Sequence, residues 1–151
     1  DAAQLIANSA SEAGIEIEVI REPSDGYWSN VWNNDAKGWA ACYWGGRPTA
    51  DWMFTTAYVN DAKWNDTAWK GTDSSKKFNS LVKDARSELD DTKRREMYYE
   101  CQHLISDDGG AIVPLFNSYV SANSKAIAMD EQIAANWDSD GAKCVERWWF
   151  A

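Results

Sequence analysis

The residues best suited to chemistry in this sequence lie in a short segment, WGGRPT, at residues 44–49, which we name the arginine loop. Gly45 and Gly46 let a ligand approach the backbone closely, and Arg47 offers a planar guanidinium that grips carboxylate or phosphate through paired hydrogen bonds. Thr49 is suited to cap a helix over residues 50–58, whose free N–H groups add donors near Arg47. The arginine loop therefore predicts a binding site for an anionic or carbonyl-rich ligand.

Other side chains near this loop extend the predicted ligand-binding set. Trp44 and Trp64 stand in or beside loops, where an indole ring often serves as a contact surface. A competing interpretation is a plain strand-to-helix turn, in which Arg47 pairs with Asp51 and only shapes the turn. The full predicted set is Trp44, Gly45, Gly46, Arg47, Asp51, Trp64 and Asn65.

No arrangement of catalytic or metal-binding residues is visible, so we expect neither an enzyme nor a bound cofactor or metal. His103 is the only histidine, and Cys101 two residues earlier points to a different face of the same predicted helix. The segment NWDSDG has the spacing of a calcium loop, but Arg147 stands at its twelfth position, where that loop needs a glutamate. The sequence also lacks a phosphate-binding glycine loop, a G-x-S-x-G elbow and an H-E-x-x-H motif.

The charge of the chain limits its partners. The sequence has 24 acidic residues against 15 Lys and Arg, and the formal net charge of −9 opposes binding to nucleic acid or an anionic membrane surface. No apolar run is long enough to predict a membrane span, and the first residues carry no signal-peptide pattern. At 151 residues, we expect a single domain with one core.

The elements that must position the arginine loop alternate between helix and strand. Apolar periodicity predicts a helix at residues 2–13, a strand at residues 15–20, a helix capped by Ser24 and a strand at residues 39–43. The short connections favour parallel pairing through a right-handed crossover. Ligands of open α/β sheets bind beyond the carboxyl ends of the strands, and the arginine loop directly follows such an end.

The second half of the chain predicts two helices followed by short strands. Apolar residues recur at helical spacing over residues 78–89 and again over residues 93–106. The runs AIVPLF and SYVSA, at residues 111–116 and 118–122, are strand candidates, and Pro114 suits a sheet edge or bulge. We therefore expect an α/β fold with a mixed, mostly parallel sheet flanked by helices.

Several segments occur in an order that is typical of a known family. They are AGI, WGGRPTADWMF, WNDTAW, DDTKRREMYYECQHLISDDGGAIVPLFNSYV and GAKCVERWWFA, and the fourth is the most specific. With them the chain resembles, over essentially its whole length, the C-terminal lobe of the dipeptide- and oligopeptide-binding family (family 5) of ABC-importer solute-binding proteins. The resemblance implies a periplasmic-binding-protein type II fold, with residues 1–151 as the C-terminal lobe of a larger, two-lobed protein.

The resemblance also implies a function. Such a protein is a monomeric periplasmic or membrane-associated receptor that captures a peptide, an opine or a related oxygen-rich or anionic solute and delivers it to a membrane permease. In peptide-binding relatives, the segment matching residues 46–51 often carries an acidic residue that pairs with the ligand's amino group. Arg47 stands there instead, which favours a ligand with a carboxylate or phosphate.

Export, if the resemblance holds, permits oxidation of the cysteines. Cys101 on an inward helix face then pairs with Cys144, leaving Cys42 as a thiol, although three cysteines allow two other pairings.

Two other function classes remain open. Ten tryptophans and an acidic charge also suit a carbohydrate-binding module, but such modules are usually all-β, and the helical periods at residues 1–13 and 76–106 oppose that. The second open class is a protein-interaction module, because a lobe without its partner lobe exposes apolar surface and sheet edges.

Overall fold

The structure, a computed structural model, describes residues 1–34 and 38–151. It separates into two compact units, Asp1–Tyr43 and Trp44–Ala151. About 45% of the chain is helical, and the sheet content of the described residues is one antiparallel pair of two-residue strands. The expected type II α/β fold, with a mixed, mostly parallel sheet flanked by helices, is therefore wrong.

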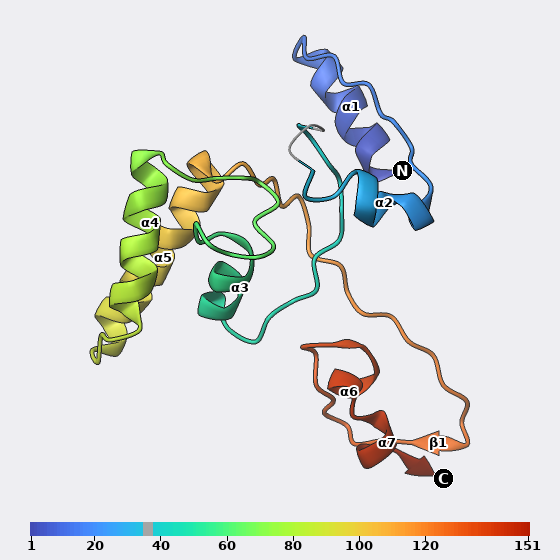
Figure 1. The fold of residues 1–151 in the computed structure, drawn as a ribbon. Helices are drawn as coiled ribbons and strands as arrows, with labels where there is room; N and C mark the ends of the chain where they lie inside the picture. The colour runs from blue at the N-terminus through green and yellow to red at the C-terminus, as the bar shows by residue number, and fades with distance from the viewer. Residues whose placement is uncertain (35–37) are drawn as a thin grey trace. The chain divides into compact units, whose positions relative to one another are not determined.

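The first unit holds two helices, α1 (Ala2–Glu12) and α2 (Ser24–Asn30) (Figure 1). The helix predicted at residues 2–13 is confirmed. The capping of α2 by Ser24 is wrong, because Pro23 holds the N-cap position and no side chain accepts a hydrogen bond there. The length and apolar stripe of α1 are local properties, which explains why the sequence predicts it well.

The two strands predicted in the first unit do not form. Residues 15–20 and residues 39–43 belong to no ladder, and Ile20 is 72% exposed. The Tyr27 hydroxyl donates to the Ala41 carbonyl oxygen at 2.7 Å, so a side chain of α2 meets this backbone where a strand was expected. Alternation of apolar residues marks a face that burial would favour, but a strand also needs a partner backbone.

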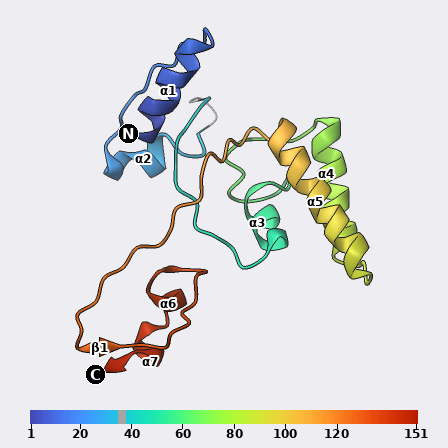
Figure 2. The same cartoon turned by 180° about the vertical axis from the view of Figure 1, so that it is seen from behind.

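The second unit begins with three helices, α3 (Ala50–Ala57), α4 (Asp73–Ala85) and α5 (Asp91–Asp108). Figures 1 and 2 both show α4 and α5 lying side by side and antiparallel. In each helix, the side chain at the N-cap accepts a hydrogen bond from a first-turn N–H group, which satisfies a donor that the helix itself cannot. The capping residues are Thr49, Thr72 and Asp90.

These three helices confirm the helical predictions for this part of the chain. The helix expected at residues 50–58 and the helix expected at residues 93–106 lie where the sequence placed them. The helix expected at residues 78–89 is shifted: it begins earlier, because Thr72 caps a polar first turn that apolar periodicity does not register, and it ends at Ala85, which leaves Leu89 exposed.

A small core lies among the three helices and the loop between α3 and α4. Its buried members are Phe54, Trp69, Phe78, Val82, Cys101 and Ile105. The ring of Phe78 is fully buried and has its centroid 5.4 Å from that of Phe54 and 5.2 Å from that of Trp69. Aromatic rings at these distances and inclined angles add attraction beyond the area that they bury.

Two carboxylates tie the helices of this core together. Asp51 on α3 receives hydrogen bonds from Arg86 after α4 and Tyr98 on α5. Asp108 at the end of α5 accepts hydrogen bonds from the Ser74 and Thr72 hydroxyls and the Trp69 indole. These hydrogen bonds hold the pKa of Asp108 below its usual value, and the bond from Ser74 has the largest effect. Both ties join segments that are distant in sequence.

The end of the chain folds on itself around one buried carboxylate. It contains β1 (Ile127–Ala128), α6 (Asp138–Ala142), α7 (Cys144–Arg147) and β2 (Trp149–Phe150), with β1 and β2 paired antiparallel. Three groups reach the buried Asp140: the Ala134 N–H at 2.6 Å, Arg147 Nη1 at 2.8 Å and Trp148 Nε1 at 3.2 Å.

The remaining predictions about this unit fail. The strand candidates at residues 111–116 and 118–122 form no ladder, and no disulfide joins Cys101 to Cys144. Cys101 is fully buried in the helical core, and burial raises the pKa of its thiol to about 11. One further finding concerns membranes. Among the described residues, no helix combines the length and the apolar character that crossing a bilayer requires.

Candidate ligand-binding site

The arginine loop holds its own cation in place. Arg47 is half-buried, and its Nη1 donates to the carbonyl oxygens of Gly45 at 2.8 Å and Gly46 at 3.2 Å. The guanidinium carbon lies 6.0 Å from the centre of the Trp44 ring, at the outer limit of a cation–π contact. The guanidinium is thus oriented by backbone acceptors that lie within two residues of it.

The Trp44 ring is also fixed. Its Nε1 donates to Asp66 Oδ2 at 3.1 Å, and Asp66 belongs to the loop between α3 and α4. A ring whose indole N–H is anchored at one end presents its remaining surface in one orientation, at a low entropic cost on binding. Trp44 and Arg47 therefore form a preorganised pair.

Arg47 has no acidic partner among the residues that the structure describes. The alternative in which Arg47 pairs with Asp51 is wrong, because both oxygens of Asp51 are taken by Arg86, at 2.9 Å to Nε and 2.8 Å to Nη2. The Tyr98 hydroxyl donates to the same carboxylate at 3.2 Å. The hydrogen bond from Arg86 is the main reason why the pKa of Asp51 lies below its usual value.

Two other predicted site residues lie in the loop between α3 and α4. The Asn65 amide donates to the carbonyl oxygens of Val59 at 3.3 Å and Trp69 at 3.4 Å, which makes it a brace of that loop. Trp64 is partly exposed, and the ammonium of Lys63 lies 4.3 Å from its ring centre. Asp51 and Asn65 are therefore scaffold residues, and the structure brings together only the arginine-loop members of the predicted set.

Sequence reasoning missed Trp137, which packs on this loop, and Tyr119, whose ring lies beside that of Trp137. A Cβ atom built on Gly45 would lie only 2.8 Å from Cζ3 of Trp137, so the Trp137 ring packs directly on the Gly45 backbone. The ring of Tyr119 lies beside that of Trp137, with the two ring centroids 6.3 Å apart. Trp137 lies inside the NWDSDG segment, and no local spacing relates it to the arginine loop.

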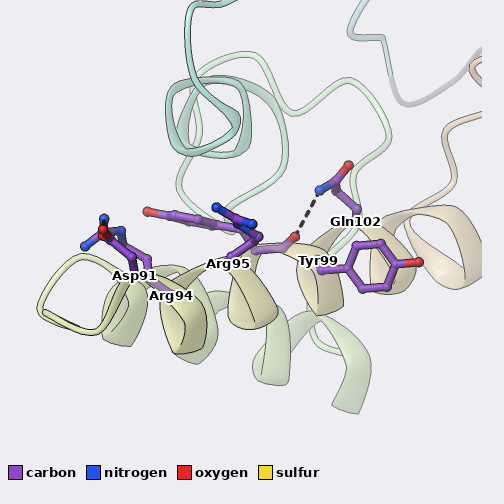
Figure 3. A pocket seen from close by; sticks show the side chains of 6 residues that line it. Asp91, Arg94, Arg95, Tyr99 and Gln102 are labelled. Atoms are coloured by element: carbon purple, nitrogen blue, oxygen red, sulfur yellow. Dashed lines mark hydrogen bonds and ion pairs between the residues drawn. The ribbon is translucent and has the colours of Figure 1, made fainter.

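Two open hollows lie elsewhere in this unit. One, of about 440 Å³, is lined only by residues of α5, including Arg94, Arg95, Tyr99 and Gln102 (Figure 3). In Figure 3, the Gln102 amide turns back to donate to the Tyr98 carbonyl oxygen, at 3.4 Å. Since one helix face supplies every lining side chain, this hollow cannot enclose a small molecule.

The second hollow, of about 420 Å³, lies between α3 and α4 and is lined by Lys63, Lys83 and Arg86 among others. Arg86 is already engaged by Asp51, so the basic lining is partly neutralised. In the first hollow, Arg94 is held by Asp91 and by the Glu88 carbonyl oxygen. The arginine loop differs in that backbone carbonyl oxygens alone hold its guanidinium.

Within the described residues, no cluster of three or more His, Cys, Asp or Glu side chains could hold a metal ion. Comparison with protein-family models, with curated proteins and with solved structures finds no match for this chain.

Proposed function

We propose that this chain serves in solute capture, as part of the substrate-binding component of an ABC importer, and that the arginine loop contacts the ligand. The observation that carries the proposal is the state of Arg47, a half-buried guanidinium that is oriented by two carbonyl oxygens and lacks a carboxylate partner among the described residues. The resemblance of the chain's motifs to the oligopeptide-binding family supports the same role.

The donors that remain on Arg47 suit a carboxylate. Both internal hydrogen bonds use Nη1, and the edge formed by Nε and Nη2 makes no hydrogen bond or ion pair with the described residues. Two N–H groups on that edge match the two oxygens of a carboxylate or phosphate in the side-on, bidentate arrangement. We therefore propose an anionic or oxygen-rich solute such as a peptide with a free carboxyl terminus or an opine.

In this role the protein performs no chemistry on the ligand. It binds the solute in the periplasm or at the outer face of the membrane and passes it, as a monomer, to the permease. Asp51 and Asn65 serve this role indirectly, because Asp51 ties α3 to Arg86 and Asn65 holds the loop that follows α3.

Isothermal titration with the peptide Ala-Ala-Ala and with its C-terminal amide tests the proposal. We expect the free acid to bind more tightly than the amide and Arg47→Ala to weaken binding of the acid by about 2 to 5 kcal/mol, since a charge-assisted pair is lost. Arg47→Lys should restore only part of the affinity, because a point charge cannot form the fork.

Arg95→Ala is the matched control, since Arg95 is an exposed arginine of α5 outside the arginine loop. Circular dichroism at 222 nm shows whether each variant keeps its helices. Binding of Ala-Ala-Ala to Arg47→Ala within twofold of the wild type, with the helix signal intact, would contradict the proposal.

A protein-interaction module is the second candidate, and one observation favours it. Residues 109–124 contain no charged side chain, although 26% of the chain is charged. Phe116 is 94% exposed, and no backbone hydrogen bond joins residues 111–122 to the rest of the described chain. Sedimentation velocity at rising concentration tests this candidate, since a strictly monomeric protein would argue against self-association through this segment.

A further inference from the structure

The strongest additional feature of the molecule is the contact between Trp137 and the arginine loop. The point where a Gly45 Cβ would stand lies 2.8 Å from Cζ3 and 2.9 Å from Cη2 of Trp137, and 3.5 Å from Nη1 of Arg47. The six-membered edge of the indole and the guanidinium thus border the same small volume. Residues that are far apart in sequence meet there.

The ring of Trp137 has a free surface at this place. It is 44% exposed although one edge packs on the Gly45 backbone, and Tyr119 beside it is 49% exposed. The two rings are inclined at 39°, with their centroids 6.3 Å apart. Residues that served only to fill a core would be buried, as Phe78 is.

We propose that Trp137 and Tyr119 form an aromatic wall beside Arg47, which selects a ligand whose carboxylate is joined to a flat, apolar group such as an aromatic side chain. This inference rests on the proposed function, in which Arg47 holds the carboxylate. A flat group that packs on an indole ring gains dispersion and quadrupole attraction and releases water from two apolar surfaces. A guanidinium alone would not distinguish such a ligand from an aliphatic one.

Gly45 is the residue that allows this arrangement. Its φ is not in the left-handed region, so alanine fits the backbone there, but the alanine methyl would meet the Trp137 ring at 2.8 Å and force it to move. Gly46 next to it has nothing within 4 Å of the same position. The two glycines therefore give a matched pair, in which only one substitution disturbs the wall.

The first experiment needs no ligand. In protein labelled with 5-fluorotryptophan, the ¹⁹F resonance of Trp137, assigned by its loss in Trp137→Phe, should shift in Gly45→Ala and stay unchanged in Gly46→Ala. An unchanged resonance in both variants would show that the ring does not pack on Gly45, and it would overturn the aromatic wall.

The second experiment measures selectivity by titration with Ala-Ala-Phe and Ala-Ala-Ala. We expect the wild type to prefer Ala-Ala-Phe by about tenfold, which corresponds to about 1.4 kcal/mol. Trp137→Ala should lose this preference and bind the two peptides with equal affinity. Trp52→Ala, which removes a similarly exposed tryptophan from α3, should keep the preference.

The outcomes separate the two proposals. If Arg47→Ala weakens binding of both peptides but Trp137→Ala keeps the preference for Ala-Ala-Phe, the aromatic wall is wrong and the anionic site stands. If Arg47→Ala binds both peptides as the wild type does, the proposed function is wrong. Failure of both peptides to bind the wild type would contradict both proposals.

Discussion

Apolar residues are buried in the helical core formed by α3, α4 and α5. In the extended run at residues 111–122 they are mostly exposed. In the core, Phe78 is fully buried and contacts two other rings, whereas Phe116 in the extended run is 94% exposed. The core also joins its helices through Asp51 and Asp108. The extended run makes no backbone hydrogen bond to other described residues.

This difference shows where the stability of the second unit resides. Burial of apolar side chains is the main favourable term in folding, and it is concentrated in one cluster. From the extended run, Ala111 packs against that cluster, whereas Phe116 remains exposed. Substitutions in the two regions should therefore differ sharply in their effect on stability.

The largest effect is expected for Phe78→Ala, which removes a fully buried ring from the centre of the core. Loss of a buried phenylalanine typically costs about 3 to 5 kcal/mol of unfolding free energy, from lost transfer energy and the remaining cavity. Phe116→Ala should change it by less than about 0.5 kcal/mol. Urea denaturation monitored at 222 nm measures both.

Equal destabilisation by the two substitutions would break the comparison, because it would mean that Phe116 is buried in solution. A rise in stability or a loss of oligomers for Phe116→Ala would instead point to self-association through the extended run.

The same two regions explain how much of the fold the sequence could predict. The helices at residues 2–13, 50–58 and 93–106 were predicted from signals that are local in sequence. These signals are the helical spacing of apolar residues and, for α3, the capping residue Thr49. One strand was predicted from alternation at residues 15–20 and another from the aromatic run at residues 39–43, but strand formation depends on a distant partner that a pattern cannot supply. The predicted fold class was therefore wrong, because these segments have strand propensity but no partner strand to pair with.

A smaller effect is expected for Asp51→Asn, which weakens the tie between α3 and Arg86. The pair is bidentate but partly exposed, with 26% of the Asp51 side chain and 54% of the Arg86 side chain accessible. We therefore expect a cost of about 1 kcal/mol at pH 7, the upper end for ion pairs at a protein surface. Asp73→Asn is the control and should cost less, because Asp73 is fully exposed in its pair with Lys76.

The pH dependence of this effect follows from the lowered pKa of Asp51 in the folded state. The folded protein binds its proton less readily than the unfolded chain, so the carboxylate stabilises the fold fully above the ordinary pKa of 3.8. That contribution is lost as the pH falls through the folded-state pKa. The difference between wild type and Asp51→Asn should therefore shrink below pH 3.8, and a constant difference would refute the assigned pairing.

The candidate site shows the same limit as the fold. Trp44, Gly45, Gly46 and Arg47 were found because they are neighbours in sequence. Trp137 was missed because only the folded chain places it on Gly45, and the pairing of Asp51 with Arg86 was missed because that partner is 35 residues away. Contacts across long sequence separations carry no signal in a single sequence.

The smallest effect compares two helix starts that look alike in sequence. Thr49 accepts a hydrogen bond from the Trp52 N–H at 3.2 Å, whereas Ser24 caps nothing, because α2 begins after Pro23. Thr49→Ala should cost about 1 kcal/mol locally and speed hydrogen exchange of the Trp52 amide by about fivefold, since the donor loses its acceptor. Ser24→Ala should leave exchange in the first turn of α2 unchanged. Slower exchange at Trp52 in Thr49→Ala, or faster exchange in α2 in Ser24→Ala, would mean that the two caps are assigned the wrong way round.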